Sequence, residues 1–181
     1  MRYPLLFKTI AAAALLWLPH IASAEQFRSN ASRFSVDYAA PWKAVSLPDP
    51  SAELFLLCDE KECGPRVLLS FSAYLQPELK SGKLSDFLKY ATADMILQNV
   101  RTAPGVAKVS VLREGRSRLG QVEAYEVVAE VLLSTGQKRI RHTFLTFNAG
   151  YVYNASLGCA PELHARSVIK AQTVLATHRF F

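Results

Sequence analysis

The second half of the chain holds three strand-like segments joined by two short turns, and this pattern constrains the fold most strongly. In the first segment Tyr125, Val127, Ala129 and Val131 alternate with other residues, which is the two-residue period of a half-buried strand. The three segments are residues 121–133, 139–147 and 151–157, and the turns are residues 134–137 and 148–150. Because such short turns connect adjacent antiparallel strands, the pattern predicts a three-stranded antiparallel meander.

The first half of the chain adds further strands. Phe34, Val36 and Tyr38 alternate with polar residues and predict one of them. The other expected strands are residues 53–58, residues 67–75 and a segment that begins at residue 109. Residues 113–121 carry three arginines and are interpreted as a basic loop. Phe34, on the apolar face of its strand, and Trp42, just after the following turn, are predicted to be core residues.

Two segments change to helical spacing. The first predicts a single helix that ends before Pro104-Gly105, with apolar positions at Leu84, Phe87, Leu88, Ala91 and Met95. The second predicts a helix that begins at Pro161, a favoured first residue of a helix. Its expected inner stripe is Ala165, Val168, Ile169, Gln172, Leu175 and Ala176. We therefore expect an α+β domain, in which helices pack on an antiparallel sheet of about six or seven strands.

The first 24 residues have the features of a secretory signal peptide. A short basic start precedes the apolar run 10–18, which is too short to span a bilayer. Ala22-Ser-Ala24 then supplies the small residues that signal peptidase requires. We expect cleavage between Ala24 and Glu25, a single domain over residues 25–181, and a periplasmic or secreted location in a bacterium.

The charge of the chain is modestly positive. The formal net charge is +6, and removal of Arg2 and Lys8 with the signal peptide would leave +4. This surplus favours solubility and gives little support to nucleic-acid binding, which we do not expect of an exported protein. Because no apolar run after Ala24 approaches about 20 residues, no membrane span is expected.

All three cysteines follow the predicted cleavage site. In an oxidising compartment, three cysteines suggest one disulfide and one remaining thiol. Cys58 ends one expected strand, and Cys63 leads into the next across the charged loop 59–62. Hairpin geometry therefore favours a Cys58–Cys63 disulfide with Cys159 free and buried. Two alternatives stay open: a zinc site built from the three cysteines and His164, and Cys159 as a nucleophile with His164 as its base.

The sequence carries no recognisable catalytic motif. It has no Ser-His-Asp order and no H-E-x-x-H spacing, and Gly120 has no glycine-rich neighbours to cradle a phosphate. His142 shares a strand face with Ile140 and Phe144, and we interpret it as a core-edge residue with one hydrogen bond. His178 lies in the C-terminal tail. We therefore expect no catalytic residue, no cofactor and no bound metal.

Several local patterns resemble those of one structural family. Phe34-Ser-Val-Asp-Tyr38 followed by Pro41-Trp42-Lys43 is similar to the F-x-V-x-Y-P-x-x-W opening of PsbP-like and DcrB-like domains. Leu119-Gly120 followed by Ala124-Tyr125 resembles their G-x-x-A entry to the central meander. A closing helix after a tyrosine-rich strand fits as well. The resemblance implies an α-β-α sandwich that serves as a non-catalytic accessory, chaperone or binding domain.

These features favour an exported, non-catalytic accessory or binding protein of the bacterial envelope, with another envelope protein as its partner. A second hypothesis is a periplasmic inhibitor or immunity protein that blocks an enzyme with the Cys58–Cys63 hairpin loop. A third hypothesis is a thiol- or metal-dependent enzyme. It requires a pocket in which Cys159, His142 or His164 meets a carboxylate.

Overall fold

The computed structural model describes residues 24–48, 52–76, 84–89 and 92–181. The signal peptide predicted for residues 1–24 lies outside these ranges, apart from Ala24. The strands are β1 (Glu25–Ser29), β2 (Phe34–Tyr38), β3 (Trp42–Val45), β4 (Leu54–Cys58), β5 (Leu68–Leu75), β6 (Val106–Leu119), β7 (Val122–Leu133), β8 (Lys138–Asn148), β9 (Tyr151–Cys159) and β10 (Arg179–Phe180). The helical segments are α1 (Glu60–Cys63), α2 (Leu84–Phe87), α3 (Ala93–Ile96), α4 (Gln98–Arg101), the 3-10 turn η2 (Pro161–Leu163) and α5 (His164–Leu175).

The strands form two sheets. The larger one has seven strands in the order β3-β4-β5-β9-β8-β7-β6, and the smaller one has three in the order β1-β2-β10. All of the pairings in both sheets are antiparallel. The meander predicted from the second half of the chain is confirmed as β7, β8 and β9. Because β9 also pairs with β5 from Leu68↔Gly158 to Leu75↔Tyr151, the meander is joined directly to the strands of the first half.

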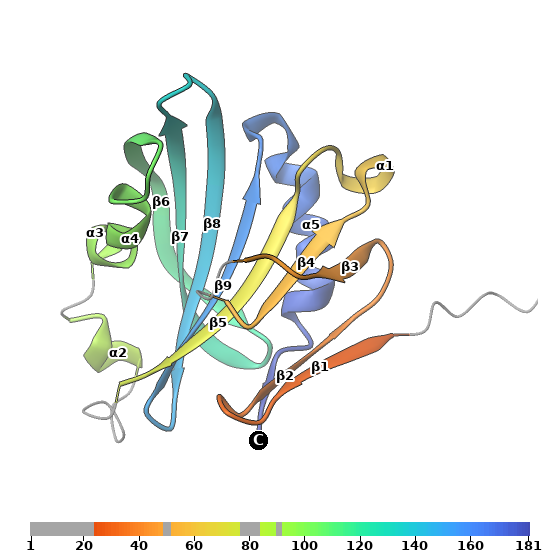
Figure 1. Ribbon diagram of the computed structural model, residues 1–181. Helices are drawn as coiled ribbons and strands as arrows, with labels where there is room; N and C mark the ends of the chain where they lie inside the picture. The colour runs from red at the N-terminus through yellow and green to blue at the C-terminus, as the bar shows by residue number, and fades with distance from the viewer. Residues whose placement is uncertain (1–23, 49–51, 77–83, 90–91) are drawn as a thin grey trace, which may run out of the picture.

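Helices cover both faces of the large sheet, with α2, α3 and α4 on one side and α5 on the other (Figure 1). Neighbouring residues of β7 show why both faces need cover, since Val127 and Val128 point to opposite sides. Val128 joins the cluster that contains Ala171 of α5, whereas Val127 packs in a separate cluster with Leu97 next to α3. The predicted α+β class, with helices packed on an antiparallel sheet, is confirmed. In the described ranges no helix is long and apolar enough to cross a membrane.

The small sheet closes one side of the main core. Phe34 of β2 is only 1% exposed and Trp42 of β3 is 3% exposed. The indole Nε1 of Trp42 donates a hydrogen bond to the carbonyl oxygen of Lys170 on α5, at 3.2 Å. This bond satisfies the polar end of a buried ring. The prediction that Phe34 and Trp42 are core residues is confirmed.

The predicted basic loop at residues 113–121 is wrong, because most of this segment belongs to the 14-residue edge strand β6. The register of β6 against β7 shifts between Val111 and Arg113, which is the mark of a bulge. Beyond the bulge Arg113 pairs with Glu126 of β7 at 2.5 Å. Because much of this edge strand is exposed, its residues show no clear alternation of apolar and polar side chains. The sequence pattern therefore did not predict a strand here.

The single helix predicted between residues 84 and 103 is also wrong. The described part of the segment holds three short helices, α2, α3 and α4, and the expected apolar position Ala91 lies outside the described residues. Thr92 caps α3, since its hydroxyl accepts a hydrogen bond from the backbone N–H of Met95. Because a new helix, α3, begins at Ala93, Leu97 is buried in the core and Met95 is 58% exposed.

The last helix begins at η2 and α5 as expected, but its buried face differs from the predicted one. Of the predicted stripe, Leu175 faces the core and Val168 packs against it, as expected. Ser167, Ala171 and Val174 also face the core, while Ile169 is 67% exposed. Other members of the predicted stripe are also exposed, namely Ala165, Gln172 and Ala176. Ser167 and Ala171 have small side chains, and a pattern based on bulky aliphatic residues does not detect such a buried face.

Candidate functional site

A polar groove lies on the α4 side of the large sheet, between α4 and strands β5, β8 and β9. Its volume is about 710 Å³, and it continues into a smaller hollow of about 200 Å³. The two hollows share Ser70, Val100 and Arg141. The larger hollow is lined by Ala52, Ser70, Ser72, Ala73, Tyr74, Asn99, Val100, Ala103, Val106, Arg141 and Asn154.

The alternation of β5 and β9 explains the polar floor of the groove. On β5, Leu69 and Phe71 are buried in the main core, so Ser70 and Ser72 point to the opposite face. The register sets Ser70 opposite Ser156 and Ser72 opposite Asn154. Hydroxyl and amide side chains therefore lie next to one another across the two strands. The sequence indicated the polar face of β5, but not its partner on β9.

A hydrogen-bond network centred on Ser156 organises this floor. The Ser156 hydroxyl lies 3.2 Å from Nη2 of Arg141, 3.1 Å from Oγ1 of Thr143 and 3.0 Å from Oδ1 of Asn154. A hydroxyl has one proton and two lone pairs, so Ser156 donates to Asn154 and accepts from the other two groups. The side-chain carbonyl oxygen of Asn154 is thereby engaged.

The charges along the groove are positive. Arg139 and Arg141 line it, and none of its described lining residues is aspartate or glutamate. Nη2 of Arg139 also donates to the carbonyl oxygen of Arg66 at 2.8 Å, which ties this side chain to the end of the sheet.

A second cluster of titratable side chains lies on the opposite face of the sheet, next to the start of α5. Nε2 of His142 is 2.6 Å from Oε1 of Glu126, and Nδ1 of His142 is 3.1 Å from Nε2 of His164. The same oxygen of Glu126 accepts a hydrogen bond from Arg113 at 2.5 Å. Since a carboxylate only accepts, His142 carries its proton on Nε2, and its Nδ1 accepts from Nε2–H of His164.

This cluster favours uncharged imidazoles. Burial lowers the pKa of His142, the nearby Glu126 carboxylate opposes that effect, and His164 and Arg113 lower the pKa further. Burial is also the main cause of the lowered pKa of His164. His142 makes two hydrogen bonds, one more than the sequence analysis predicted. In the sequence, His142, His164 and Arg113 lie too far apart to suggest a cluster. The pairing of β6, β7 and β8 and the packing of α5 on the sheet bring them together.

The enzyme hypothesis required a carboxylate near these side chains, and Glu126 supplies one. Burial raises the pKa of Cys159 to about 11, which does not favour an activated thiolate. Glu126, His142 and His164 are also absent from the described lining of the groove. The cluster holds α5 to the sheet on one face, while the groove opens on the other.

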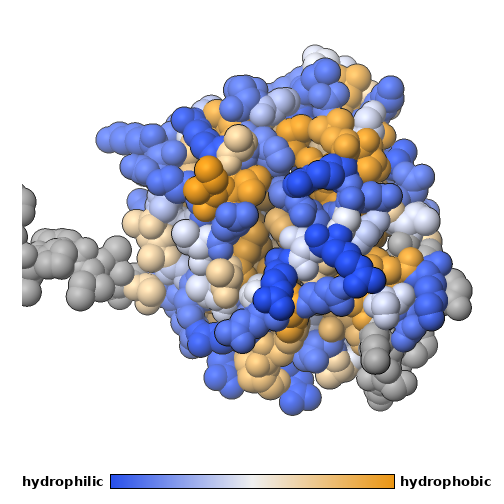
Figure 2. Space-filling view, turned by 180° about the vertical axis from the view of Figure 1, so that it is seen from behind, coloured by the Kyte–Doolittle hydropathy of each residue, from blue (hydrophilic) through white to orange (hydrophobic). Residues whose placement is uncertain are grey.

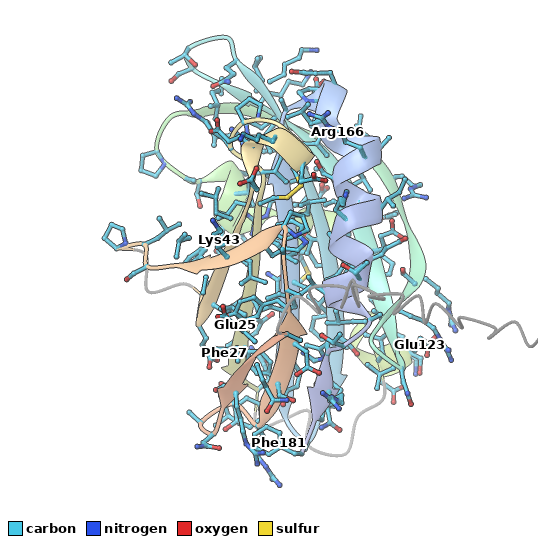
Figure 3. All side chains as sticks on the ribbon, turned by 90° about the vertical axis from the view of Figure 1, so that its right-hand side faces the viewer. Glu25, Phe27, Lys43, Glu123, Arg166 and Phe181 are labelled. Atoms are coloured by element: carbon cyan, nitrogen blue, oxygen red, sulfur yellow. A yellow bond between two sulfur atoms is a disulfide. The ribbon has the colours of Figure 1, made fainter. Side chains whose placement is uncertain are left out.

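Cys58 and Cys63 form a disulfide across α1, with their Cα atoms 6.0 Å apart, and Cys159 is a buried thiol. The segment expected to be a loop is a helical turn, capped by the Asp59 side chain. It lies beside α5 (Figure 3), and Glu62 pairs with Lys170 of α5 at 2.9 Å. Among the described residues, no group of three or more His, Cys, Asp or Glu side chains is arranged to hold a metal.

His178, which the sequence placed in a tail, is a core residue. It is 4% exposed and stacks on Phe34 and Phe71, with ring centroids 5.4 and 6.2 Å away. Burial lowers its pKa to about 4. Gly120 lies against the backbone of His178 with φ +61°, so a side chain at this position would collide with the carbonyl oxygen of His178. The Leu119-Gly120 pattern is thus a packing feature.

The reverse side of the molecule shows hydrophobic residues as separate patches between hydrophilic ones (Figure 2). Small hydrophobic patches of this kind are normal on a soluble protein surface and do not mark a site. The groove and the histidine cluster are therefore the two features of chemical interest.

Comparison with known proteins supports the fold. No model of a known protein family matches the chain, and no curated protein matches it in sequence. The solution structure of cyanobacterial PsbP (CyanoP) from Synechocystis sp. PCC 6803 aligns with a TM-score of 0.61 at 16% identity, over 89% of this chain and 94% of that one. The Ran-binding protein Mog1p of Saccharomyces cerevisiae aligns with a TM-score of 0.58 at 8% identity, over 88% and 96%. The protein therefore has a PsbP-like fold.

Proposed function

We propose that this protein is an exported, non-catalytic binding protein of the bacterial envelope, and that it holds a partner protein in the groove between α4 and strands β5, β8 and β9. The observation that carries the proposal is the groove itself, about 710 Å³ in volume and floored by the hydrogen-bonded side chains of Arg141, Asn154 and Ser156. Polar groups held in place before binding lose little conformational entropy when a partner arrives.

The chemistry of the groove supports binding rather than catalysis. Its described lining offers hydroxyl, amide and guanidinium groups, and none of these is a general base near neutral pH. Glu126, His142 and His164 could exchange protons, but they lie on the α5 face of the sheet. A substrate in the groove would not reach them. CyanoP and Mog1p share the fold alone at this level of identity, and Mog1p, a Ran-binding protein, is an example of this fold in a protein that binds another protein.

The inhibitor hypothesis gains less support from the structure. Its inhibitory element would be the Cys58–Cys63 turn, whose four polar residues are exposed. That turn lies against α5 through the Glu62–Lys170 ion pair and the buried Cys63, and so it does not project as a free loop. If affinity capture retrieved an enzyme that binds this turn, that result would favour the inhibitor hypothesis.

The test is affinity capture from the envelope fraction of the native organism with two bulky variants. Ser72→Trp places an indole in the groove, and Gln172→Trp places the same side chain on the exposed face of α5. We expect the wild type and Gln172→Trp to retain the same partner, and Ser72→Trp to lose it. Retention of that partner by Ser72→Trp, with the groove shown to be filled, would refute the proposal.

A further inference from the structure

We propose that strand β6 is a self-association surface, through which two copies of this chain pair edge to edge and join their large sheets. β6 is the last strand of the seven, and among the described strands β7 is its one neighbour. Residues 111–118 of β6 are all exposed or half-buried. The outward backbone N–H and C=O groups of this stretch are therefore open to a further strand. Residues 113–117 are absent from the described lining of the groove, so this surface is separate from the proposed partner site.

The regular part of this edge contains a glycine that the chain itself does not require. After the bulge between Val111 and Arg113, the register against β7 runs without a break to Leu119. Gly115 lies inside this stretch without a left-handed backbone conformation, and a Cβ atom built on it meets no described atom within 4 Å. A glycine within a strand is typical of a site where another backbone approaches closely. Gly115 therefore marks the place where a second strand fits.

A two-fold axis at Gly115 gives the edge a complementary charge pattern. In an antiparallel pair of identical strands, positions equally far from the axis on its two sides meet. Glu114 of each copy then lies opposite Arg116 of the other, and Arg113 lies opposite Ser117. Opposite charges that face each other across two strands stabilise the pair, and like charges destabilise it. An axis at Glu114 or at Arg116 would instead set two identical charges against each other.

The contacts that these side chains make within one chain are compatible with the pairing. Oε2 of Glu114 accepts a hydrogen bond from the hydroxyl of Tyr125 at 2.7 Å, and Nη1 of Arg116 donates to Glu123 at 2.6 Å. A carboxylate has a second oxygen and a guanidinium has five N–H donors, so neither bond has to break. Charged side chains on an edge strand usually prevent pairing. In the register centred on Gly115 they favour it.

Sedimentation velocity of the purified protein over a range of concentrations measures the association. We expect a reversible equilibrium between monomer and dimer. Glu114→Arg and Arg116→Glu each create two like-charge pairs, so each should weaken the dimer at least about tenfold. A mixture of these two variants should form the dimer again, because every arginine of one chain then meets a glutamate of the other. Glu60→Arg makes the same charge change on α1 and should associate as the wild type does.

A cysteine at the axis tests the register directly. Gly115→Cys sets two thiols opposite each other, where the Cα separation of paired strands falls within the range of about 4.4–6.8 Å that a disulfide requires. The matched control is Ser117→Cys, whose two copies are displaced by about 13 Å along the strands and cannot be joined. We expect mild oxidation to give a covalent dimer with Gly115→Cys alone. The native free thiol, Cys159, is buried.

Circular dichroism and the melting temperature of each variant confirm folding, and Gly115→Cys decides the outcome if the charge variants do not fold. A wild type that stays monomeric at every concentration would overturn the proposal. A mixture of Glu114→Arg and Arg116→Glu that forms no dimer would do the same, as would equal cross-linking of the two cysteine variants. An equal loss of association in Glu60→Arg would also overturn it, since net charge rather than this edge would then control association.

Discussion

His178 provides the sharpest test of the core, because it is a titratable ring buried among aromatic ones. Phe34 and Phe71 stack on it with interplanar angles of 17° and 15°, and Tyr153 and Phe180 meet it edge-on. Within the described residues, its Nδ1 is buried without a hydrogen-bond partner. Burial lowers the pKa of His178 to about 4.

This pKa determines how much folding stability the protein loses in acid. An unfolded histidine titrates near pH 6.5, and lowering the pKa to about 4 in the folded protein corresponds to about 3 kcal/mol. As the pH falls below about 6.5, the unfolded chain takes up a proton that folded His178 does not. Folding stability therefore decreases until about pH 4, where the folded form is protonated as well. Above about pH 6.5 this contribution does not vary with pH.

The assay is urea unfolding of the wild type and His178→Phe at several values between pH 7.5 and pH 4. Phenylalanine keeps an aromatic ring in the stack and cannot be protonated. His142 and His164 titrate in both proteins, so the difference between the two stability curves isolates His178. We expect the variant to gain about 3 kcal/mol relative to the wild type as the pH falls from 7 to 4.

Parallel stability curves for the two proteins would show that His178 is not held neutral by burial. His178→Leu serves as a second variant, because phenylalanine is larger than histidine and can strain a tight core. Its baseline stability at pH 7 will differ from that of His178→Phe, but its pH dependence should show the same missing contribution.

Three further predictions concern other parts of the chain. Trp42→Ala should lower the free energy of unfolding by about 3–5 kcal/mol, measured by urea titration, and an unchanged stability would contradict the core placement of this ring. Non-reducing peptide mapping should find Cys58 joined to Cys63, with reduction costing about 2 kcal/mol for so short a loop; a disulfide peptide that contains Cys159 would exclude this pairing. Intact-mass analysis of exported protein should show a chain cleaved after Ala24, and a retained leader would instead indicate an anchor.

The parts of the fold that the sequence predicted are those encoded by local patterns. The strands β7, β8 and β9 have a two-residue period and short turns, so both their existence and their order could be inferred. The start of the last helix at Pro161 was equally clear. The edge strand β6 was missed because its exposed residues lack that period. The buried face of α5 was misplaced because Ser167 and Ala171 are small rather than strongly apolar.

Neither chemical site could be predicted, because both depend on residues far apart in the sequence. Ser70 meets Ser156 only through the pairing of β5 with β9, across 86 positions of the chain. His142 meets Glu126 and His164 only after β7, β8 and α5 have assembled. The residues themselves were visible, but the register that joins them is a property of the whole sheet.

The pairing of β10 with β2 has a consequence for the order in which the domain can be made. Phe180 lies opposite Phe34, and the backbone N–H of Phe181 donates to the carbonyl oxygen of Arg33, so one of the first strands is completed by residues translated nearly 150 positions later. A nascent chain that has not yet reached His178 leaves Phe34 and Phe71 without the ring that separates them. The core of this domain therefore cannot close before the codons for β10 have been translated, and until then Phe34 of β2 lacks its partner Phe180.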